Sequence, residues 1–294
     1  MKVAWLQDLN FITEAGGAQL TDRTHFSEGI RRGHDMILCT PEGGNPIPRD
    51  HDIYIISNIS LWSVDLFHEM LTWGKPLVWF NHDYFPICKY RLFYPMRETC
   101  KSCYLKERWL PIFMKSHLMI WLSPLHRESW MWLYPELREI PYHLAPSPVQ
   151  SDNFKDLGLP RDGVVAVESL FPFKGREHVL HWAEQHQQIK VTFVGGNPQP
   201  QDPLPPNCIS IGPVSPDGMN EVYNQHEALL HLPQSPSPFD RVVAEAYLAG
   251  CKIIGNDNVG ALSWDEAFKQ GRKAVATLCR ESPKLFWKAI KDSM

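Results

Sequence analysis

Short apolar runs alternate with turn-rich or helical segments along the first half of the chain. The runs occupy residues 2–6, 36–39, 53–56, 76–80 and 118–122. Runs of this length, rich in apolar and β-branched residues, are typical of strands buried on both faces of a sheet. Parallel strands need a crossover connection, usually a helix, so the alternation predicts parallel sheets covered by helices. The predicted fold class is therefore α/β.

The same alternation resumes after a segment rich in Pro and Ser. Residues 141–160 read PYHLAPSPVQSDNFKDLGLP and have neither a helical nor a strand period, which is typical of a domain boundary. A chain of 294 residues has room for two domains, since single cores seldom grow past about 250 to 300 residues. We expect domains at 1–148 and 149–294, with a hinge near Pro146–Gln150 about which they close.

The second half is expected to repeat the pattern of the first. Strands are expected at 163–169, 189–196, 207–212, 227–234 and 252–257, and helices at 174–188, 216–226 and 239–250. The chain ends in SPKLFWKAIKDSM, which is predicted to be a helical tail of the second domain. Its Leu285, Phe286 and Ile290 need a neighbouring surface to bury them.

Composition excludes several classes of protein. With 44% hydrophobic and 21% charged residues, the chain is too apolar for a disordered protein. The net charge of −4 argues against a broad basic surface that binds phosphate backbones regardless of sequence. Without a secretory signal or 18 consecutive apolar residues, we expect no membrane span, although the 11 Trp and 14 Phe leave peripheral membrane contact open. Seven scattered cysteines are no disulfide framework, which favours a reducing, cytoplasmic location.

Two loops of the second half have the composition of anion sites. Residues 233–238, PQSPSP, follow an expected strand and precede a helix, so their amides would face a ligand at the carboxyl edge of the sheet. Residues 252–261, KIIGNDNVGA, end a strand with residue types that tolerate unusual backbone angles. An ordinary turn is the alternative for each loop. In the helix between them, Glu245 needs a donor, either a ligand or a cation on the helix surface.

Residues 239–261, FDRVVAEAYLAGCKIIGNDNVGA, resemble the donor-site signature of glycosyltransferase family 4, the group 1 glycosyltransferases. Further segments match that family in order: EAGGAQL, VVAVESLFPFKG, VTFVGGN and IGPVSPDGMNEVYNQHEALLHLPQS. The resemblance spans residues 2–264 and implies a GT-B fold. In that fold two Rossmann-like α/β/α domains face each other across a cleft. The first would hold the acceptor and the second the nucleotide sugar.

The resemblance also implies a set of donor-binding residues. Glu245 would hold the ribose, which suits a carboxylate because it accepts from two vicinal hydroxyls, and Lys174 would neutralise the diphosphate. We expect these two side chains to line one pocket. Gly16 and Gly17 have no Cβ to block close approach to the diphosphate. The full donor set is Gly16, Gly17, Ser169, Lys174, Ser237, Phe239, Glu245, Asn258, Val259 and Gly260.

Two positions depart from the family pattern. Ser237 stands where relatives have an acidic residue that contacts the transferred sugar, and Ser169 where they have an arginine near the diphosphate. A lysine does not replace the bidentate bonding of an arginine. Arg176 or Arg241 could compensate for this loss, and a degenerate, non-catalytic sugar-nucleotide-binding protein is the alternative.

His82 and Asp83 follow the expected strand at 76–80. A lone His is most often a structural residue, but this one matches the family's His-Asp pair, whose His lies near the reacting centre of the sugar. Asp83 could orient the imidazole ring or cap the next helix. The expected catalytic residues are thus His82, Asp83 and Lys174.

Cys88, Cys100 and Cys103 include a C-x-x-C spacing that occurs in metal sites. Structural zinc takes four ligands and only three cysteines are local, although His82 or His117 could complete a site. We expect free thiols in a structural loop and no metal, with zinc at these cysteines as the lesser alternative.

Residues 107–137 concentrate Trp, Met and Leu and carry few charges. A buried helix and strand of the first domain explain such a stretch. A hydrophobic acceptor surface or membrane-facing patch is the alternative, as in transferases that glycosylate lipids.

The function implied by the resemblance is a retaining, hexosyltransferase-like transfer from a nucleotide-diphosphate sugar to an acceptor hydroxyl. We expect it to need no metal and no cofactor besides the donor substrate. The acceptor could be a glycan, a lipid-linked sugar, a protein or a modified nucleic acid. A nucleotide-sugar epimerase or a phosphorylase shares the two-Rossmann plan and is the alternative enzyme.

Overall fold

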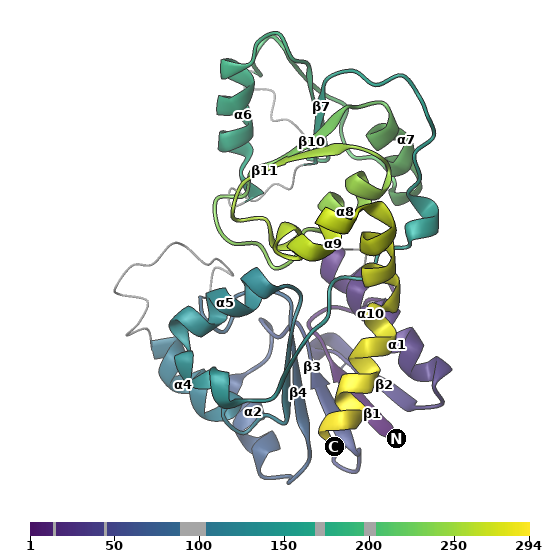
Figure 1. The fold of residues 1–294 in the computed structure, drawn as a ribbon. Coiled ribbons are helices and arrows are strands. Elements are labelled where there is room, and N and C mark those ends of the chain that lie inside the picture. The colour runs from purple at the N-terminus through teal and green to yellow at the C-terminus, as the bar shows by residue number, and fades with distance from the viewer. Residues whose placement is uncertain (14–15, 44–45, 89–103, 168–173, 197–203) are drawn as a thin grey trace. The chain divides into compact units, whose positions relative to one another are not determined.

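The computed structural model describes residues 1–13, 16–43, 46–88, 104–167, 174–196 and 204–294. It divides into two compact units (Figure 1). Unit 1 consists of Met1–Pro148 together with Glu281–Met294, and unit 2 of Val149–Arg280. Each unit contains one parallel sheet with helices packed against it, so the predicted α/β fold class is confirmed.

Sheet A of unit 1 has the strand order β2-β1-β3-β4-β5-β6, and neighbouring strands are parallel. The strands are β1 (Lys2–Leu6), β2 (Asp35–Cys39), β3 (Ile53–Ile56), β4 (Leu77–Asn81), β5 (Leu118–Trp121) and β6 (Tyr142–Leu144). The first five agree with the predicted runs to within one residue. Strand β6 was not predicted, because it has three residues, lies in the Pro-rich segment and is only partly buried.

Helices cover both faces of sheet A. They are α1 (Gly17–Arg31), α2 (Val64–Leu71), α4 (Tyr104–Phe113) and α5 (Pro124–Leu133), together with the end of α10 (Arg272–Ser293). Serines start two of them in the expected way: Ser63 and Ser123 accept backbone N–H bonds in the first turns of α2 and α5.

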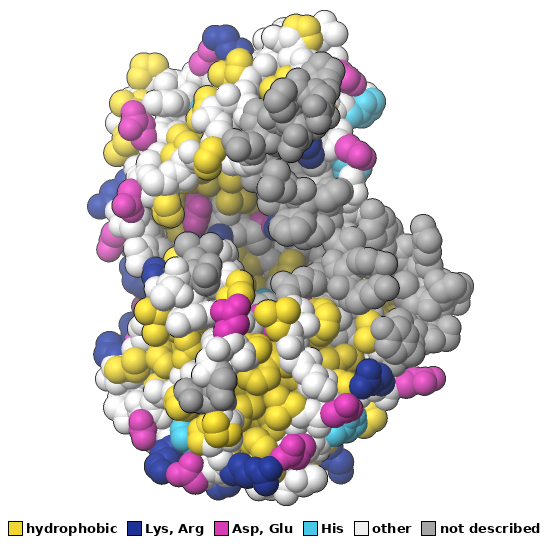
Figure 2. Space-filling model, turned by 180° about the vertical axis from the view of Figure 1, so that it is seen from behind, with side chains coloured by type: hydrophobic (Ala, Val, Ile, Leu, Met, Phe, Trp, Pro, Cys, Tyr) yellow, Lys and Arg dark blue, Asp and Glu magenta, His cyan; other side chains and the backbone are white. Residues whose placement is uncertain are grey.

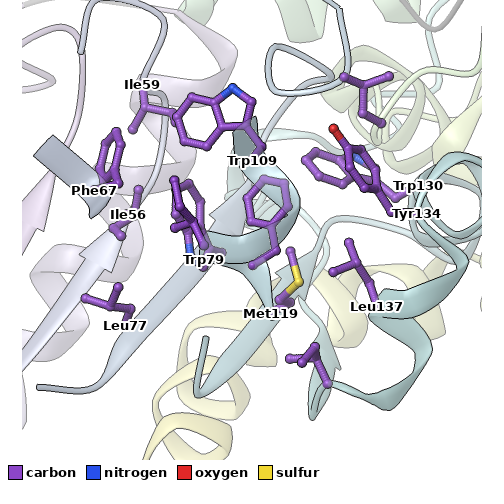
Figure 3. Close-up of a cluster of buried hydrophobic side chains, with 14 of the residues drawn as sticks. Ile56, Ile59, Phe67, Leu77, Trp79, Trp109, Met119, Trp130, Tyr134 and Leu137 are labelled. Carbon is purple, nitrogen blue, oxygen red and sulfur yellow. The ribbon is translucent and has the colours of Figure 1, made fainter. Parts of the chain in front are cut away.

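One face of sheet A carries a large aromatic and aliphatic cluster between the strands and helices α2, α4 and α5. Figure 3 shows Trp79, Trp109, Trp130 and Tyr134 among its aliphatic side chains. Three of these four aromatic residues come from the Trp- and Met-rich stretch 107–137. That stretch is therefore mainly core in the structure, and not the exposed acceptor or membrane surface that was its alternative.

The opposite face of sheet A is packed with aromatic rings from four segments. Trp5 of β1 stacks on Phe286 of α10, with ring centroids 5.8 Å apart, and also contacts Phe26 of α1 and Phe80 of β4. Aromatic pairs at such distances are favourable beyond the area they bury. This face therefore depends on the last turns of the chain.

The tail corrects one expected boundary. We assigned residues 281–294 to the second domain, but Glu281–Met294 belongs to unit 1. Phe286 and Ile290 are completely buried there, and Trp287 Nε1 donates to His25 O at 2.8 Å. The aromatic face of β1 and α1 is the neighbouring surface that the tail needed. Leu285, on the outer side of the helix, remains 45% exposed.

Sheet B of unit 2 has the strand order β11-β10-β7-β8-β9, again with parallel neighbours. Its strands are β7 (Val164–Val167), β8 (Val191–Val194), β9 (Cys208–Ser210), β10 (Ala228–His231) and β11 (Lys252–Gly255). The helices of unit 2 are α6 (Arg176–Gln185), α7 (Met219–Asn224), α8 (Arg241–Leu248) and α9 (Asp265–Gln270). The first turns of α10 also belong to unit 2. The five strands and helices α6 to α8 were predicted. Helix α8 begins at Arg241 and not at Phe239, because Asp240 has a left-handed backbone, with φ 64°.

The surface carries charges of both signs. Figure 2 shows Lys and Arg side chains interspersed with Asp and Glu on the described part of one face, without an extended area of one sign. This distribution agrees with the net charge of −4. Among the described residues, no helix combines the length and the apolar character needed to cross a bilayer.

Because the tail completes the aromatic face, Phe286→Ala should lower the free energy of unfolding of unit 1 by about 3–5 kcal/mol. Urea unfolding followed by tryptophan fluorescence measures this, since all tryptophans but Trp182 and Trp264 lie in unit 1. The matched control is Leu285→Ala on the exposed side of the same helix, which should cost less than about 1 kcal/mol. Equal losses in the two variants would contradict the packing described here.

Candidate functional site

The strand order of sheet B reverses between β7 and β10, where successive strands diverge to opposite sides. Open parallel sheets bind ligands at such a switch point, outside the carboxyl ends of the strands. A small pocket lies there, lined by Ala166, Val167, Lys174, Arg176, Val179, Leu230 and His231. Two permanent cations and one imidazole thus meet in a single pocket. The segment that joins Val167 to Lys174 lies outside the described residues, and predicted Ser169 with it.

A buried carboxylate, Asp240, lies directly beside this pocket. Its Oδ1 is 3.4 Å from Lys174 Nζ, and its Oδ2 is 3.2 Å from His231 Nε2 and hydrogen-bonded to Ser237 Oγ. Burial alone would raise the pKa of the Asp240 carboxyl, but the charges of His231 and Lys174 outweigh it and hold that pKa well below its ordinary value. The site therefore contains a permanent negative charge beneath its cations.

Asp240 is the non-glycine residue with a positive φ among the described residues. Its φ of 64° and ψ of 81° lie where residues with a Cβ are strained. Strained backbone persists only where the surroundings hold it, and such positions cluster at functional sites. Here the ion pair with Lys174, the contact with His231 Nε2 and the hydrogen bond with Ser237 Oγ hold it.

Two predicted loops are tied together at Ser237. Ser237 N donates to Asn258 O at 2.8 Å, and Gly260 N donates to Ser237 Oγ at 3.0 Å. A Cβ on Gly260 would lie 2.3 Å from Ser237 O, so the loops can approach this closely only because residue 260 is a glycine. The amides of Asn258, Val259 and Gly260 all donate within the chain, and Phe239 and Val259 are buried at 2% exposure.

Glu245 lies one turn along α8 from Arg241, and the described lining of the Lys174 pocket does not include it. That both side chains line one donor site stays a prediction. Its two oxygens are 3.4 Å from Arg241 Nη2 and 3.4 Å from Tyr223 Oη. Burial raises the pKa of Glu245 above its ordinary value, although Arg241 and Tyr223 act against it. The structure therefore shows the helical ion pair that was the alternative explanation of this residue. Of the two arginines considered, Arg176 lines the pocket and Arg241 pairs with Glu245.

In unit 1 the predicted His82 follows β4 and is buried. Its Nε2 lies 2.6 Å from Oδ1 of Asp22, a fully buried residue of α1, whose Oδ2 accepts from Ser57 Oγ. The neighbouring Asp83 accepts a hydrogen bond from Phe85 N at its Oδ1, at 2.9 Å, within the turn that follows β4. Asp22 is the carboxylate hydrogen-bonded to His82, and a role of Asp83 in orienting the ring or capping a helix stays a prediction.

Gly16 and Gly17 mark the start of α1 in unit 1. Gly16 is the N-cap residue with extended backbone, and Gly17 is the first helical residue. The unit 1 candidates are therefore the glycine pair, His82 and Asp83, and the unit 2 candidates are Lys174, Ser237, Phe239, Glu245 and residues 258–260.

Sequence reasoning missed three buried charged or titratable residues: Asp22, His231 and Asp240. His231 ends an expected strand and so carried a usable signal, because the carboxyl ends of parallel strands face ligands. Asp240 lies inside the quoted donor signature without matching its acidic position. Asp22 is 60 residues from His82 in sequence, and no local pattern joins them.

The described residues give no support to the alternative of a zinc site at the cysteines. Cys88 is a free thiol of intermediate exposure, whereas Cys100 and Cys103 lie outside the described residues. Within the described ranges, no group of three or more His, Cys, Asp or Glu could hold a metal ion.

No protein-family model matches the chain, and a search of curated proteins finds no match. Solved structures, however, match its fold over the whole chain. Sucrose-phosphate synthase from Thermosynechococcus elongatus matches with a TM-score of 0.67 and 15% identity, over 99% of this chain and 97% of that chain. HepE of Anabaena in complex with UDP-glucose matches with a TM-score of 0.62 and 16% identity, over 100% and 97%.

An alpha-glucosyltransferase in complex with UDP and a 13-mer DNA containing an HMU base matches with a TM-score of 0.55 and 12% identity, over 100% of this chain and 99% of that chain. These neighbours are GT-B glycosyltransferases, so the GT-B fold implied by the resemblance is confirmed. At these identities the likeness is one of fold.

The depressed pKa of Asp240 makes a pH prediction for unit 2. Its ion pairs contribute stability above the unfolded-state pKa, about 4, and lose it as the pH falls below that value. Asp240→Asn should therefore lower the melting temperature at pH 7 and make its decline in acid shallower. Calorimetry across this pH range measures both effects. The exposed Asp257→Asn should behave as the wild type, and an Asp240→Asn profile parallel to the wild type would refute the buried ion pair.

Proposed function

We propose that the protein is a glycosyltransferase that takes a sugar from a nucleotide-diphosphate sugar and transfers it to an acceptor hydroxyl, with retention of configuration and without a metal ion. The observation that carries the proposal is the pocket at the switch point of sheet B, where Lys174, Arg176 and His231 converge. A diphosphate is the ligand that such a group of donors binds best, since its oxygens take several charge-assisted hydrogen bonds at once. The GT-B fold supports this choice of ligand class.

In this proposal unit 2 holds the donor. Lys174 and Arg176 bind the diphosphate, and Asp240 keeps the Lys174 ammonium in place until the donor arrives. In relatives an arginine stands at the position of Ser169. Arg176 is proposed to replace it in binding the diphosphate, because a guanidinium can bond two phosphate oxygens at once. Two of the structural neighbours were solved with UDP or UDP-glucose, which supports a uridine nucleotide as the first donor to test.

Glu245 is the proposed ribose-binding residue. Its contacts to Arg241 and Tyr223 are both 3.4 Å, longer than a well-formed charge-assisted hydrogen bond. A carboxylate has about four lone-pair sites, so it can also accept from two vicinal hydroxyls. The ribose would then lie one helical turn along α8 from the diphosphate pocket.

The proposed chemistry breaks the bond between the anomeric carbon and the diphosphate through an oxocarbenium-like state. The departing phosphate oxygen takes the acceptor proton on the same face, so no nucleophile of the protein is required. Lys174 and Arg176 stabilise the negative charge that develops on the leaving group, the kind of term that usually contributes most to catalysis. Metal independence is proposed because these cations occupy the leaving-group site.

The chain does contain one Asp-x-Asp pair that could suggest a metal site, Asp50 and Asp52. It precedes β3 and so lies at the amino edge of sheet A. Asp50 pairs with Lys2 Nζ at 2.7 Å, and Asp52 accepts from Lys2 N at 2.8 Å. This pair therefore lies at the edge opposite to the one where open parallel sheets bind ligands.

Unit 1 is the proposed acceptor domain, with His82 beside the reacting sugar. The proposed acceptors are glycans, lipid-linked sugars, proteins and modified nucleic acid; the net charge of −4 argues against a long nucleic acid held by a broad basic surface. Free thiols at Cys39, Cys88, Cys208, Cys251 and Cys279 support the reducing, cytoplasmic location that we propose.

Lys174→Gln should weaken UDP binding about tenfold to a hundredfold, because a bond to a charged phosphate is worth about 1.5–3 kcal/mol. Isothermal titration calorimetry with UDP measures the loss. The matched control is Lys190→Gln, which removes an exposed lysine paired with Asp162 and should leave the affinity unchanged. Equal UDP affinity in wild type and Lys174→Gln would contradict the proposed site.

Glu245→Gln should remove the preference for ribose, because a neutral amide accepts less strongly from the two hydroxyls than a carboxylate does. The comparison is between UDP and 2′-deoxy-UDP. Wild type should bind UDP about tenfold more tightly, and the variant should bind the two with nearly equal affinity. If the variant kept the full wild-type ratio, Glu245 would be the structural ion-pair residue only.

A further inference from the structure

Sheet A has a switch point of its own, between β1 and β3. Strand β2 lies on one side of β1, and β3 to β6 follow in order on the other. The residues that leave the carboxyl ends of three neighbouring strands here are Gln7 after β1, Ser57 after β3 and His82 after β4. All three are polar and buried, with exposures of 0%, 6% and 8%. Open parallel sheets bind ligands outside the carboxyl ends of their strands at such a switch point.

These three side chains leave the strands on the same face. Side chains alternate along a strand, so Gln7 shares its face with Trp5, and His82 shares its face with Phe80. The rings of Trp5 and Phe80 contact each other at 6.3 Å, and both contact Phe286. By the same alternation Ser57 lies opposite to Ile56, which belongs to the core cluster of the other face. Gln7, Ser57 and His82 therefore lie on the face that α1 covers.

Helix α1 places a carboxylate over two of the three. Asp22 accepts from Ser57 Oγ and lies 2.6 Å from His82 Nε2. Asp22 is completely buried, and the His82 side chain is 2% exposed. The imidazole is thus fixed at one nitrogen by a group that cannot move into solvent.

The third member, Gln7, has an amide without a partner. Neither its Nε2 nor its Oε1 makes a hydrogen bond within the described part of the chain, although the residue is completely buried. A buried polar group left unsatisfied costs about 1–3 kcal/mol, so such groups are rare in the absence of a role. An amide both donates and accepts, which matches the hydroxyl group of a sugar.

We propose that the carboxyl edge of β1, β3 and β4 is a carbohydrate-binding site in which the Gln7 amide pairs with a sugar hydroxyl beside the fixed imidazole of His82. The proposal rests on the proposed function and deepens it, because it names the group that recognises a sugar in unit 1. The hydroxyl can belong to the transferred sugar of the donor or to an acceptor sugar. The experiment separates the two sources.

The test variant is Gln7→Met, which keeps the length of the side chain and removes both polar atoms. Its melting temperature should rise by a few degrees, because an unsatisfied amide is replaced by an apolar group. Its affinity for UDP should not change, because UDP binds in unit 2. If the hydroxyl belongs to the donor sugar, UDP-glucose binds more tightly than UDP in the wild type, and this ratio of affinities should fall about tenfold in the variant. If the hydroxyl belongs to an acceptor sugar, the variant should lose the binding of D-glucose in the presence of UDP, which saturation-transfer NMR measures.

The matched control is Asn207→Leu in unit 2. Asn207 Nδ2 donates to the carbonyl oxygens of Ala183, His186 and Ile189, so this variant should melt at a lower temperature and keep sugar binding unchanged. The proposal would be overturned if Gln7→Met melted at a lower temperature than the wild type or failed to fold. It would also be overturned if the variant bound UDP-glucose and D-glucose as the wild type does, or if the wild type bound neither sugar. Failure of the proposed function is a different result, namely no binding of UDP at all.

Discussion

The buried carboxylate of Asp240 is the interaction on which the arrangement of unit 2 depends. A lone charge in this position would be expensive, and it is tolerated because Lys174, His231 and Ser237 surround it. The carboxylate also holds two pocket side chains, Lys174 and His231, beside the N-cap of α8. Ser237 also connects this carboxylate to the 256–260 loop, because its Oγ donates to Asn258 O and accepts from Gly260 N. One charge thus connects the ends of β10 and β11.

This network also gives the departure at Ser237 a physical meaning. The serine removes a carboxylate from the position where the family resemblance expects one, but its hydroxyl bonds to the Asp240 carboxylate three residues further on. Negative charge is therefore kept at this corner of the sheet. The Asp240 carboxylate is buried and contacts Lys174 and His231 of the chain itself. This arrangement differs from that of an acidic residue that contacts the transferred sugar directly.

Most of the fold could be predicted from the sequence, because strands buried on both faces leave contiguous apolar runs such as 53–56 and 164–167. The weak elements were missed for the same reason: β6 is short and half-buried. The site was predicted less well. Motif positions such as Lys174 are local, whereas the pairing of Asp22 with His82 and the place of the tail depend on contacts between distant segments. Sequence periodicity contains no information about such contacts.

The seating of Phe286 and Trp287 against β1 and α1 has a consequence for how the chain folds during synthesis. The ribosome releases the N-terminal strands first, and domains usually fold in that order. Here the half that is made first lacks aromatic rings that Phe286 and Trp287 supply from more than 130 residues further along the chain. Unit 2 is complete once Arg280 has emerged, so the unit that is translated first is finished last.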